Sequence, residues 1–143
     1  MDLHEHASLS LCGAAALYLA TADASAAAAF WVAGTLVDVD HLVDYWRDDG
    51  FNLKVARFFV YFPRRLPVFL LLPFHAWEWP LGLLAVAWGA GAPLWVWGLA
   101  AGWLSHLVLD QRFNPLQKPL CYWFAYRWNR GFRASQFYDG GPL

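Results

Sequence analysis

Each of the five histidines in this chain has a carboxylate within four residues, at spacings that suit a metal ion. His106 and Asp110 are four residues apart, so on a helix their side chains lie one above the other. His75 and Glu78, three residues apart, can share a helix face in the same way. Imidazole and carboxylate ligands without thiolates suit Zn²⁺, Mn²⁺ or Fe²⁺. We therefore predict a centre of one to three divalent ions, with zinc as the first choice.

A third group of candidate ligands lies in the stretch Val37-Asp-Val-Asp-His-Leu-Val-Asp44. Asp40 and Asp44 are four residues apart, and His41 and Asp44 are three apart, so several oxygens and one imidazole can converge there. Asp44 fits a hydrated residue at a helix end as well as it fits a ligand. His6 precedes the first apolar segment, with His4 as a weaker companion.

The full set of expected ligands comes from four separate parts of the chain: His6, Asp38, Asp40, His41, His75, Glu78, His106 and Asp110. Three of these carboxylates, Asp38, Asp40 and Glu78, are also candidates for acid–base chemistry. The competing interpretation of His75 and Glu78 is a pair that bonds internally and holds helices together. The remaining acidic residues of interest are expected to be solvated charges: Asp2, Asp23, Asp48, Asp49 and Asp139.

The composition predicts that a bilayer surrounds these residues. Hydrophobic residues make up 59% of the chain, with ten Trp and eleven Phe, which exceeds the usual content of a globular domain of this size. A net charge of −1 and the lack of a basic run argue against nucleic acid as a partner. Cys12 and Cys121 form no CxxC pair and are expected to be packing residues.

We expect one all-α membrane domain over residues 1–143 with four transmembrane helices. The apolar stretches place the spans at about 7–21, 24–46, 73–90 and 93–111. A span that starts near Pro73 would be kinked at Pro80. Gly98 and Gly102 form a small-xxx-small face for close approach of another helix, including one from a second copy in a homo-oligomer.

The basic residues predict the orientation of these spans. All ten Lys and Arg follow Tyr45 in the sequence. They lie in two regions: the middle connection over residues 47–65, and the tail after Leu109. By the positive-inside rule both regions and both termini are cytoplasmic, in an inner (plasma) membrane. Amphipathic stretches at about 51–66 and 120–137 are expected to be interfacial helices.

With this topology the candidate ligands come from four helices and lie at one depth, in the cytoplasmic leaflet. Nothing else in the pattern requires their depths to agree. Ionisable groups within or beside a span are costly unless they are paired or bound to an ion, so they mark functional positions. The agreement in depth is therefore the main sequence argument for a shared site.

These motifs together resemble the bacterial and archaeal membrane-bound metal-dependent hydrolases. The resemblance rests on Leu36-Val-Asp-Val-Asp-His-Leu-Val-Asp-Tyr45, on the mid-chain histidine and on Ser105-His-Leu-Val-Leu-Asp110. It implies the same set of ligands except Glu78, which stands where many members have a second histidine. A looser similarity to all-helical zinc phospholipases C and nucleases suggests a phosphoester as substrate.

The first hypothesis is accordingly a metal-dependent hydrolase of a phosphoester in a lipid or lipid-linked substrate. The metal would lower the pKa of a bound water to about 7, and Asp40 or Asp38 would act as base. Arg47, Arg64 and Arg65 are candidates to hold the headgroup. The second hypothesis is a non-catalytic protein in which the ion joins the helices. Transport is a weaker third, because the site lies at one end of the bundle.

Overall fold

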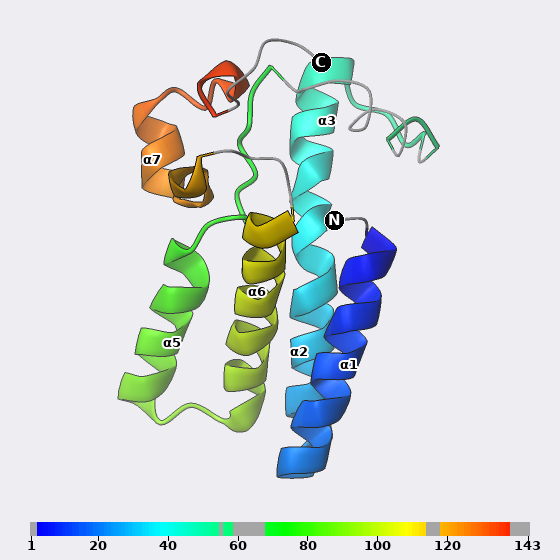
Figure 1. The fold of residues 1–143 in the computed structure, drawn as a ribbon, viewed down its shortest axis with the longest axis vertical. Helices are drawn as coiled ribbons and strands as arrows, with labels where there is room; N and C mark the ends of the chain where they lie inside the picture. Colours follow the sequence, from blue (N-terminus) through cyan, green and yellow to red (C-terminus); the bar gives the residue numbers. More distant parts are fainter. Residues whose placement is uncertain (1–2, 55, 59–67, 114–117, 138–143) are drawn as a thin grey trace.

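The computed structural model describes residues 3–54, 56–58, 68–113 and 118–137, and helices dominate throughout (Figure 1). The longer helices are α1 (Leu3–Thr21), α2 (Ala24–Leu36), α3 (His41–Asp49), α5 (Glu78–Ala90) and α6 (Leu94–Phe113). The shorter ones are η1 (Val37–Asp40), η2 (Pro119–Tyr122), α7 (Phe124–Asn129) and η3 (Ala134–Gln136). The all-α class predicted from the sequence is confirmed.

Helices α1 and α2 form the expected hairpin, and Asp23 closes it. The Asp23 carboxylate accepts hydrogen bonds from the backbone N–H of Ala26 at 2.9 Å and from the Ser25 hydroxyl at 2.6 Å. It therefore caps the start of α2, where helix N–H groups lack backbone partners. Asp23 is thus the solvated charge expected from the sequence, and it has the further role of capping α2.

Helix α2 continues through η1 into α3 as one rod (Figure 1). This stretch, Ala24–Asp49, is long and apolar enough to cross a membrane, and among the described residues no other helix meets the same criteria of length and hydropathy. The rod ends where Gly50 adopts a positive φ of 78°.

Helix α5 begins at Glu78, five residues later than the span start expected at Pro73. Pro80 therefore lies in the first turn of the helix, where its missing N–H would have no partner within the helix in any case. The predicted kink at Pro80 is avoided for this reason. Gly91 ends α5 in the left-handed conformation and Pro93 precedes α6.

Helices α2 and α6 approach closely because glycines remove the side chains between them. A Cβ added at Gly98 would lie 2.2 Å from the Ala26 carbonyl oxygen, and one at Gly102 would lie 2.1 Å from the Phe30 carbonyl oxygen. The small-residue face predicted at these glycines is thus occupied by α2 of the same chain. A homo-oligomer through this face would have to displace α2.

Gly98→Val is expected to destabilise the protein by about 3 kcal/mol or more, because the added carbon meets backbone that cannot rotate away. Metal content should fall with it, since α6 carries candidate ligands and α2 leads directly into η1, which carries Asp38. Thermal unfolding in detergent measures the first effect and metal analysis the second. Gly89→Val is the control, because a Cβ there meets nothing within 4 Å. Equal melting temperatures for the two variants would contradict this packing.

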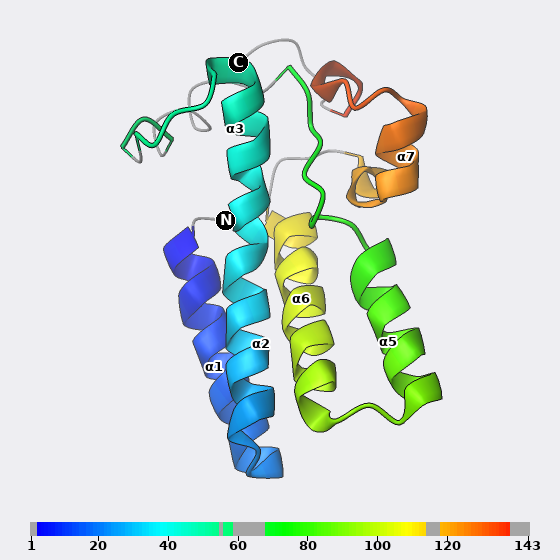
Figure 2. The same ribbon diagram turned by 180° about the vertical axis from the view of Figure 1, so that it is seen from behind.

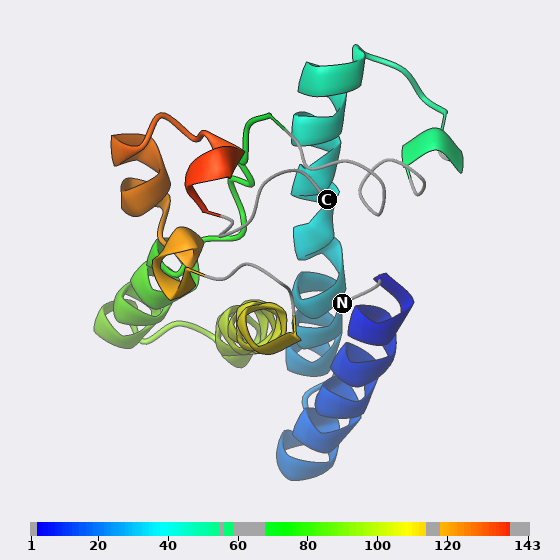
Figure 3. The same cartoon turned by 45° about the horizontal axis from the view of Figure 1, so that its top comes forward.

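Residues 119–137, the C-terminal segment, fold as three short helical pieces rather than the single interfacial helix expected over 120–137. The segment lies beside residues 68–77, which we call the His75 loop, and above the N-terminal end of α5 (Figure 2, Figure 3). Backbone bonds join the two: Leu70 N–H donates to Phe132 O at 2.8 Å and Trp77 N–H to Tyr122 O at 2.9 Å. The other expected interfacial helix, 51–66, lies largely outside the described residues.

Candidate metal centre

Four ligand atoms from three parts of the fold converge between η1, α6 and the His75 loop. Asp38 Oδ1 lies 3.4 Å from His75 Nε2 and 3.3 Å from His106 Nε2. Asp110 Oδ2 lies 3.0 Å from His75 Nε2 and 3.5 Å from His106 Nε2. The two Nε2 atoms are 3.2 Å apart. We call His75, His106, Asp38 and Asp110 the ligand set.

These distances match the spacing of ligands around a small cation. Zinc–nitrogen and zinc–oxygen bonds of about 2.0–2.2 Å imply separations of about 3.3–3.6 Å between the corners of a tetrahedron. The five distances above run from 3.0 to 3.5 Å. They cover all pairs of the ligand set except the two carboxylates with each other, so the set fits a tetrahedral ion with small adjustments.

The hydrogen bonds of the two imidazoles fix which nitrogen faces this point. His106 Nδ1 lies 3.0 Å from the Gly34 carbonyl oxygen, and His75 Nδ1 lies 2.9 Å from Asp40 Oδ1. Both partners are acceptors, so each Nδ1 carries the proton and donates it. Each Nε2 is then left with a lone pair toward the centre. An outer carbonyl or carboxylate that orients a histidine in this way is typical of metal sites.

A positive charge is favoured where these atoms meet. Two nitrogen lone pairs and two carboxylate oxygens at these distances repel one another without one. A proton could join two of the four acceptors, whereas a divalent ion can bind all four and neutralise both carboxylates. Burial strengthens the argument, since His75, His106 and Asp110 are at most 2% exposed and uncompensated buried charge is costly.

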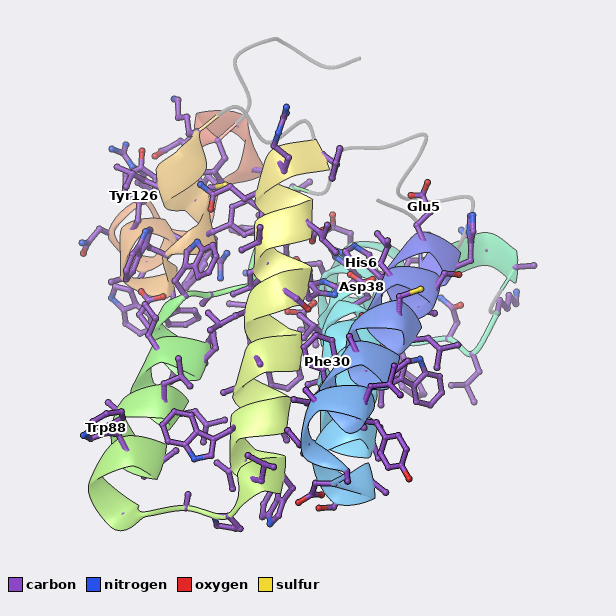
Figure 4. The ribbon with its side chains drawn as sticks, turned by 60° about the horizontal axis from the view of Figure 1, so that its bottom comes forward. Glu5, His6, Phe30, Asp38, Trp88 and Tyr126 are labelled. Carbon is purple, nitrogen blue, oxygen red and sulfur yellow. The ribbon has the colours of Figure 1, made fainter. Side chains whose placement is uncertain are left out.

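Two further histidines flank the ligand set. His6, from α1, places Nε2 2.8 Å from Asp110 Oδ1 and stacks on the His106 ring at 3.9 Å between centroids. Figure 4 shows His6 close to Asp38 between α1 and α6. His41 Nε2 lies 3.5 Å from Asp38 Oδ1. His6 completes one group that could hold an ion, with Asp38, His106 and Asp110, and His41 completes another, with Asp38 and His75.

Asp40 orients the His75 loop instead of joining the ligand set. Besides the His75 ring, its carboxylate accepts hydrogen bonds from the backbone N–H of Phe74 at 2.7 Å and of His75 at 3.2 Å. Its side chain is 1% exposed. The structure thus gives Asp40 the role of positioning His75, and it does not support the prediction that Asp40 is a base at the ion.

Asp40 is the first of three carboxylates at four-residue intervals along the rod. We call Asp40, Asp44 and Asp48 the carboxylate ladder. Asp44 accepts hydrogen bonds from the backbone N–H of Leu71 at 3.0 Å and of Leu72 at 3.3 Å. Asp48 accepts one from Val68 N–H at 2.8 Å. Three carboxylates at four-residue intervals therefore bind successive N–H groups of the His75 loop. Asp44 is neither a hydrated helix end nor a ligand, and Asp48 is not merely a solvated charge.

Other predicted site residues lie elsewhere. The Glu78 carboxylate accepts hydrogen bonds from the backbone N–H of Phe124 and of Ala125, both at 2.9 Å, so it caps α7. It neither pairs with His75 nor faces the ligand set. Arg47 stacks 3.8 Å over the Phe69 ring, and His4 is exposed. Arg64 and Arg65 lie outside the described residues.

The surroundings of His75 are strongly negative. Burial alone would lower its pKa, but Asp40, Asp110 and Asp38 together raise the pKa well above the ordinary value. Such an environment favours a positive charge at this position, whether on the ring or on an ion beside it. The opposite holds for Cys121 in the C-terminal segment, where burial raises the thiol pKa to about 11 and keeps the sulfur neutral.

Three contributors to the site were not predicted. The Gly34 carbonyl orients His106, and its residue type carried no signal for that role. Arg127 binds the backbone of the His75 loop, but nothing separated it from the other basic residues of the tail. The carboxylate ladder did have a signal, the spacing of Asp40, Asp44 and Asp48 on one helix face.

No protein-family model, curated protein or solved structure matches this chain significantly. What the site can do therefore follows from its own geometry. Buried histidine and aspartate groups form a site able to hold a metal ion.

Proposed function

We propose that the protein is a membrane-embedded metal-dependent hydrolase of phosphoesters, as its resemblance to the membrane-bound metal-dependent hydrolases suggests. The observation that carries the proposal is the convergence of two Nε2 lone pairs and two carboxylate oxygens in the ligand set. His75, His106, Asp38 and Asp110 would hold the ion. A bound divalent cation supplies a water of lowered pKa and neutralises charge on a phosphoryl group.

The distribution of charge supports four spans, α1, α2, α5 and α6, with the metal centre at their cytoplasmic ends. The described basic residues lie in α3, in the end of α6 and in the segments that follow these helices. The two turns at the opposite end, at 22–23 and 91–93, contain no Lys or Arg. Large side chains on the helices also face outward: Leu19 is 85% exposed and Trp88 is 81% exposed, which suits contact with lipid.

Exposure identifies the open side of the centre. Asp38 is 15% exposed and His41 is 26% exposed, whereas the other side chains of the ligand set are nearly inaccessible. A substrate phosphoryl group would therefore approach from the side of His41. His41 lies within reach of Asp38 but outside the ligand set, which suits a residue that transfers a proton to or from the reacting oxygens.

An apolar groove between α5 and α6 suggests that the substrate carries a hydrocarbon chain. The groove is open along its length and has a volume of about 670 Å³. Its lining includes Phe74, Trp79, Gly82, Leu83 and Trp103. Phe74 adjoins His75, so the groove ends at the loop that carries a metal ligand. We assign it to the acyl or prenyl chain of a lipid whose phosphoester reaches the centre.

Hydrolysis by the purified protein tests the function directly. Phosphate or phosphoalcohol release from short-chain phospholipids and prenyl phosphates in detergent should require added Zn²⁺ or Mn²⁺ and stop with a chelator. A soluble phosphoester without a chain should be a poorer substrate. If no member of such a panel is turned over by metal-loaded protein, the hydrolase proposal fails.

Gly82→Leu is expected to raise KM for a long-chain substrate at least tenfold while leaving metal affinity unchanged. A Cβ at Gly82 meets nothing within 4 Å, so the side chain would fill the groove without a clash. Leucine is also a better helix residue than glycine. Gly89→Leu is the matched control, because it lies on the same helix outside the groove lining. Equal KM values for both variants would remove the groove from substrate binding.

The burial of the ligand set favours a second candidate function, in which the ion only joins the helices. A structural site has a closed coordination sphere, whereas a catalytic one keeps an open position. His75, His106 and Asp110 leave little room for a substrate on their own. The two candidates differ in whether the His41 side is used, which the activity of a His41→Gln variant measures.

A further inference from the structure

Arg127 is a buried cation in the C-terminal segment. Its side chain is 1% exposed, although the surrounding tail is rich in exposed aromatic and basic residues. The guanidinium donates three hydrogen bonds to main-chain carbonyls: Nη1 to His75 O at 2.8 Å and to Cys121 O at 2.7 Å, and Nη2 to Leu72 O at 2.9 Å. One side chain thus joins the C-terminal segment to the His75 loop at two points.

Placing a guanidinium there is costly. Burial lowers the pKa of Arg127, which reflects the free energy of removing its charge from water. Carbonyl dipoles accept hydrogen bonds from Nη1 and Nη2 without neutralising the charge, and the buried Nε–H has no hydrogen-bond partner among the described residues. A planar fork of donors can reach several carbonyls at once, which a shorter or single-headed side chain cannot reproduce. These features suit a residue that fixes backbone geometry.

The rest of the C-terminal segment holds the same loop. Glu78 caps α7 just before Arg127, and Ala134 N–H donates to Val68 O at 3.1 Å. An apolar cluster beneath them combines loop residues with residues of the segment and of α6: Leu70, Leu72, Leu107, Cys121, Tyr122, Ala134 and Phe137. The loop is therefore held on one side by the carboxylate ladder and on the other by the C-terminal segment.

We infer that Arg127 is a positioning residue for the metal centre, acting through His75. His75 is held at its ring and N–H by Asp40 and at its carbonyl by Arg127. Its Nε2 belongs to the ligand set, so the C-terminal segment sets the affinity of the centre for its ion. The inference rests on the metal site of the proposed function and assigns control of that site to a segment outside the four long helices.

The test compares Arg127→Met with Arg130→Met. Arg130 is exposed and lies 4.3 Å over the Tyr126 ring, so it is a matched basic residue of the same short segment. Zn²⁺ titration against a chelating dye should show an affinity loss of about 10- to 100-fold for Arg127→Met, as for other residues behind metal ligands. Arg130→Met should match the wild type.

A double-mutant cycle separates positioning from general destabilisation. In a His75→Ala background, Arg127→Met is expected to cause no further loss of Zn²⁺ affinity, because the ligand that it positions is already gone. An equal loss in both backgrounds would overturn the inference. Arg127→Lys keeps the charge without the fork and should bind Zn²⁺ with intermediate affinity; wild-type affinity in this variant would also overturn it.

Cys121 gives a readout that does not depend on metal. It is buried within the C-terminal segment, and its carbonyl accepts a hydrogen bond from Arg127. In a Cys12→Ser background, thiol alkylation should be slow in the wild type and in Arg130→Met and fast in Arg127→Met. If wild-type protein binds no metal, the proposed function fails, while the labelling rate still decides whether Arg127 holds the segment on the loop. Unchanged slow labelling in Arg127→Met would overturn that role.

Discussion

His106→Ala is expected to remove stoichiometric metal from the protein, with an affinity loss of more than about 100-fold. Loss of a residue that orients a metal ligand typically lowers metal affinity about 10- to 100-fold. His106 is itself in the ligand set, so its loss should lower the affinity further. Its Nε2 lies within 3.5 Å of the other three ligand atoms, so its loss removes one corner of the ligand set. Metal analysis after purification and Zn²⁺ titration measure the loss.

The same variant should lose its stabilisation by metal. When free Zn²⁺ is present at about 100 times its dissociation constant, the bound ion stabilises the wild-type protein by about 2.7 kcal/mol. This stabilisation appears as a higher melting temperature with Zn²⁺ than with a chelator. His106→Ala should melt at one temperature in both conditions. His4→Ala is the control, since His4 is an exposed histidine of α1 two residues from His6. Full metal content in His106→Ala would reduce the histidine to a packing residue.

The position of this site was predictable because local spacing constrains it and the expected topology places the ligands at one end of the helices. A helix places His106 and Asp110 on one face whatever surrounds it. The distribution of basic residues then predicted that the ends of separate helices share a depth. Both arguments need only one helix at a time, and the structure brings His6, Asp38, His75, His106 and Asp110 together at the expected end of the bundle.

The roles within the site depend on contacts between distant segments and were not predictable in this way. Glu78 and His75 have the spacing of a ligand pair, yet helix α5 begins only at Glu78 and His75 lies in the preceding loop. The two side chains therefore never share a helix face. Asp40 has the same residue type as Asp38, but the backbone N–H groups of the His75 loop bind it. Tertiary packing decides which carboxylate contacts the loop.

His41→Gln is expected to separate the two candidate functions. In the hydrolase, the exposed His41 transfers a proton at the open side of the ligand set, so its loss should lower turnover about 10²- to 10⁴-fold. Metal content and melting temperature should stay near wild type, because the ligand set is intact. Turnover of the lipid phosphoester, metal analysis and thermal unfolding on the same samples provide the three readouts.

Asp40→Asn is the contrasting variant, because Asp40 acts on the centre only through His75. An amide accepts hydrogen bonds from the loop less strongly than a carboxylate, so Zn²⁺ affinity should fall about 10- to 100-fold and turnover should recover at high Zn²⁺. If the ion only joins the helices, neither the wild type nor His41→Gln will turn over the lipid phosphoester, and the two proteins will match in metal content and melting temperature. A fall in metal content from two ions to one in His41→Gln would instead make His41 a ligand, with Asp38 shared between neighbouring ions.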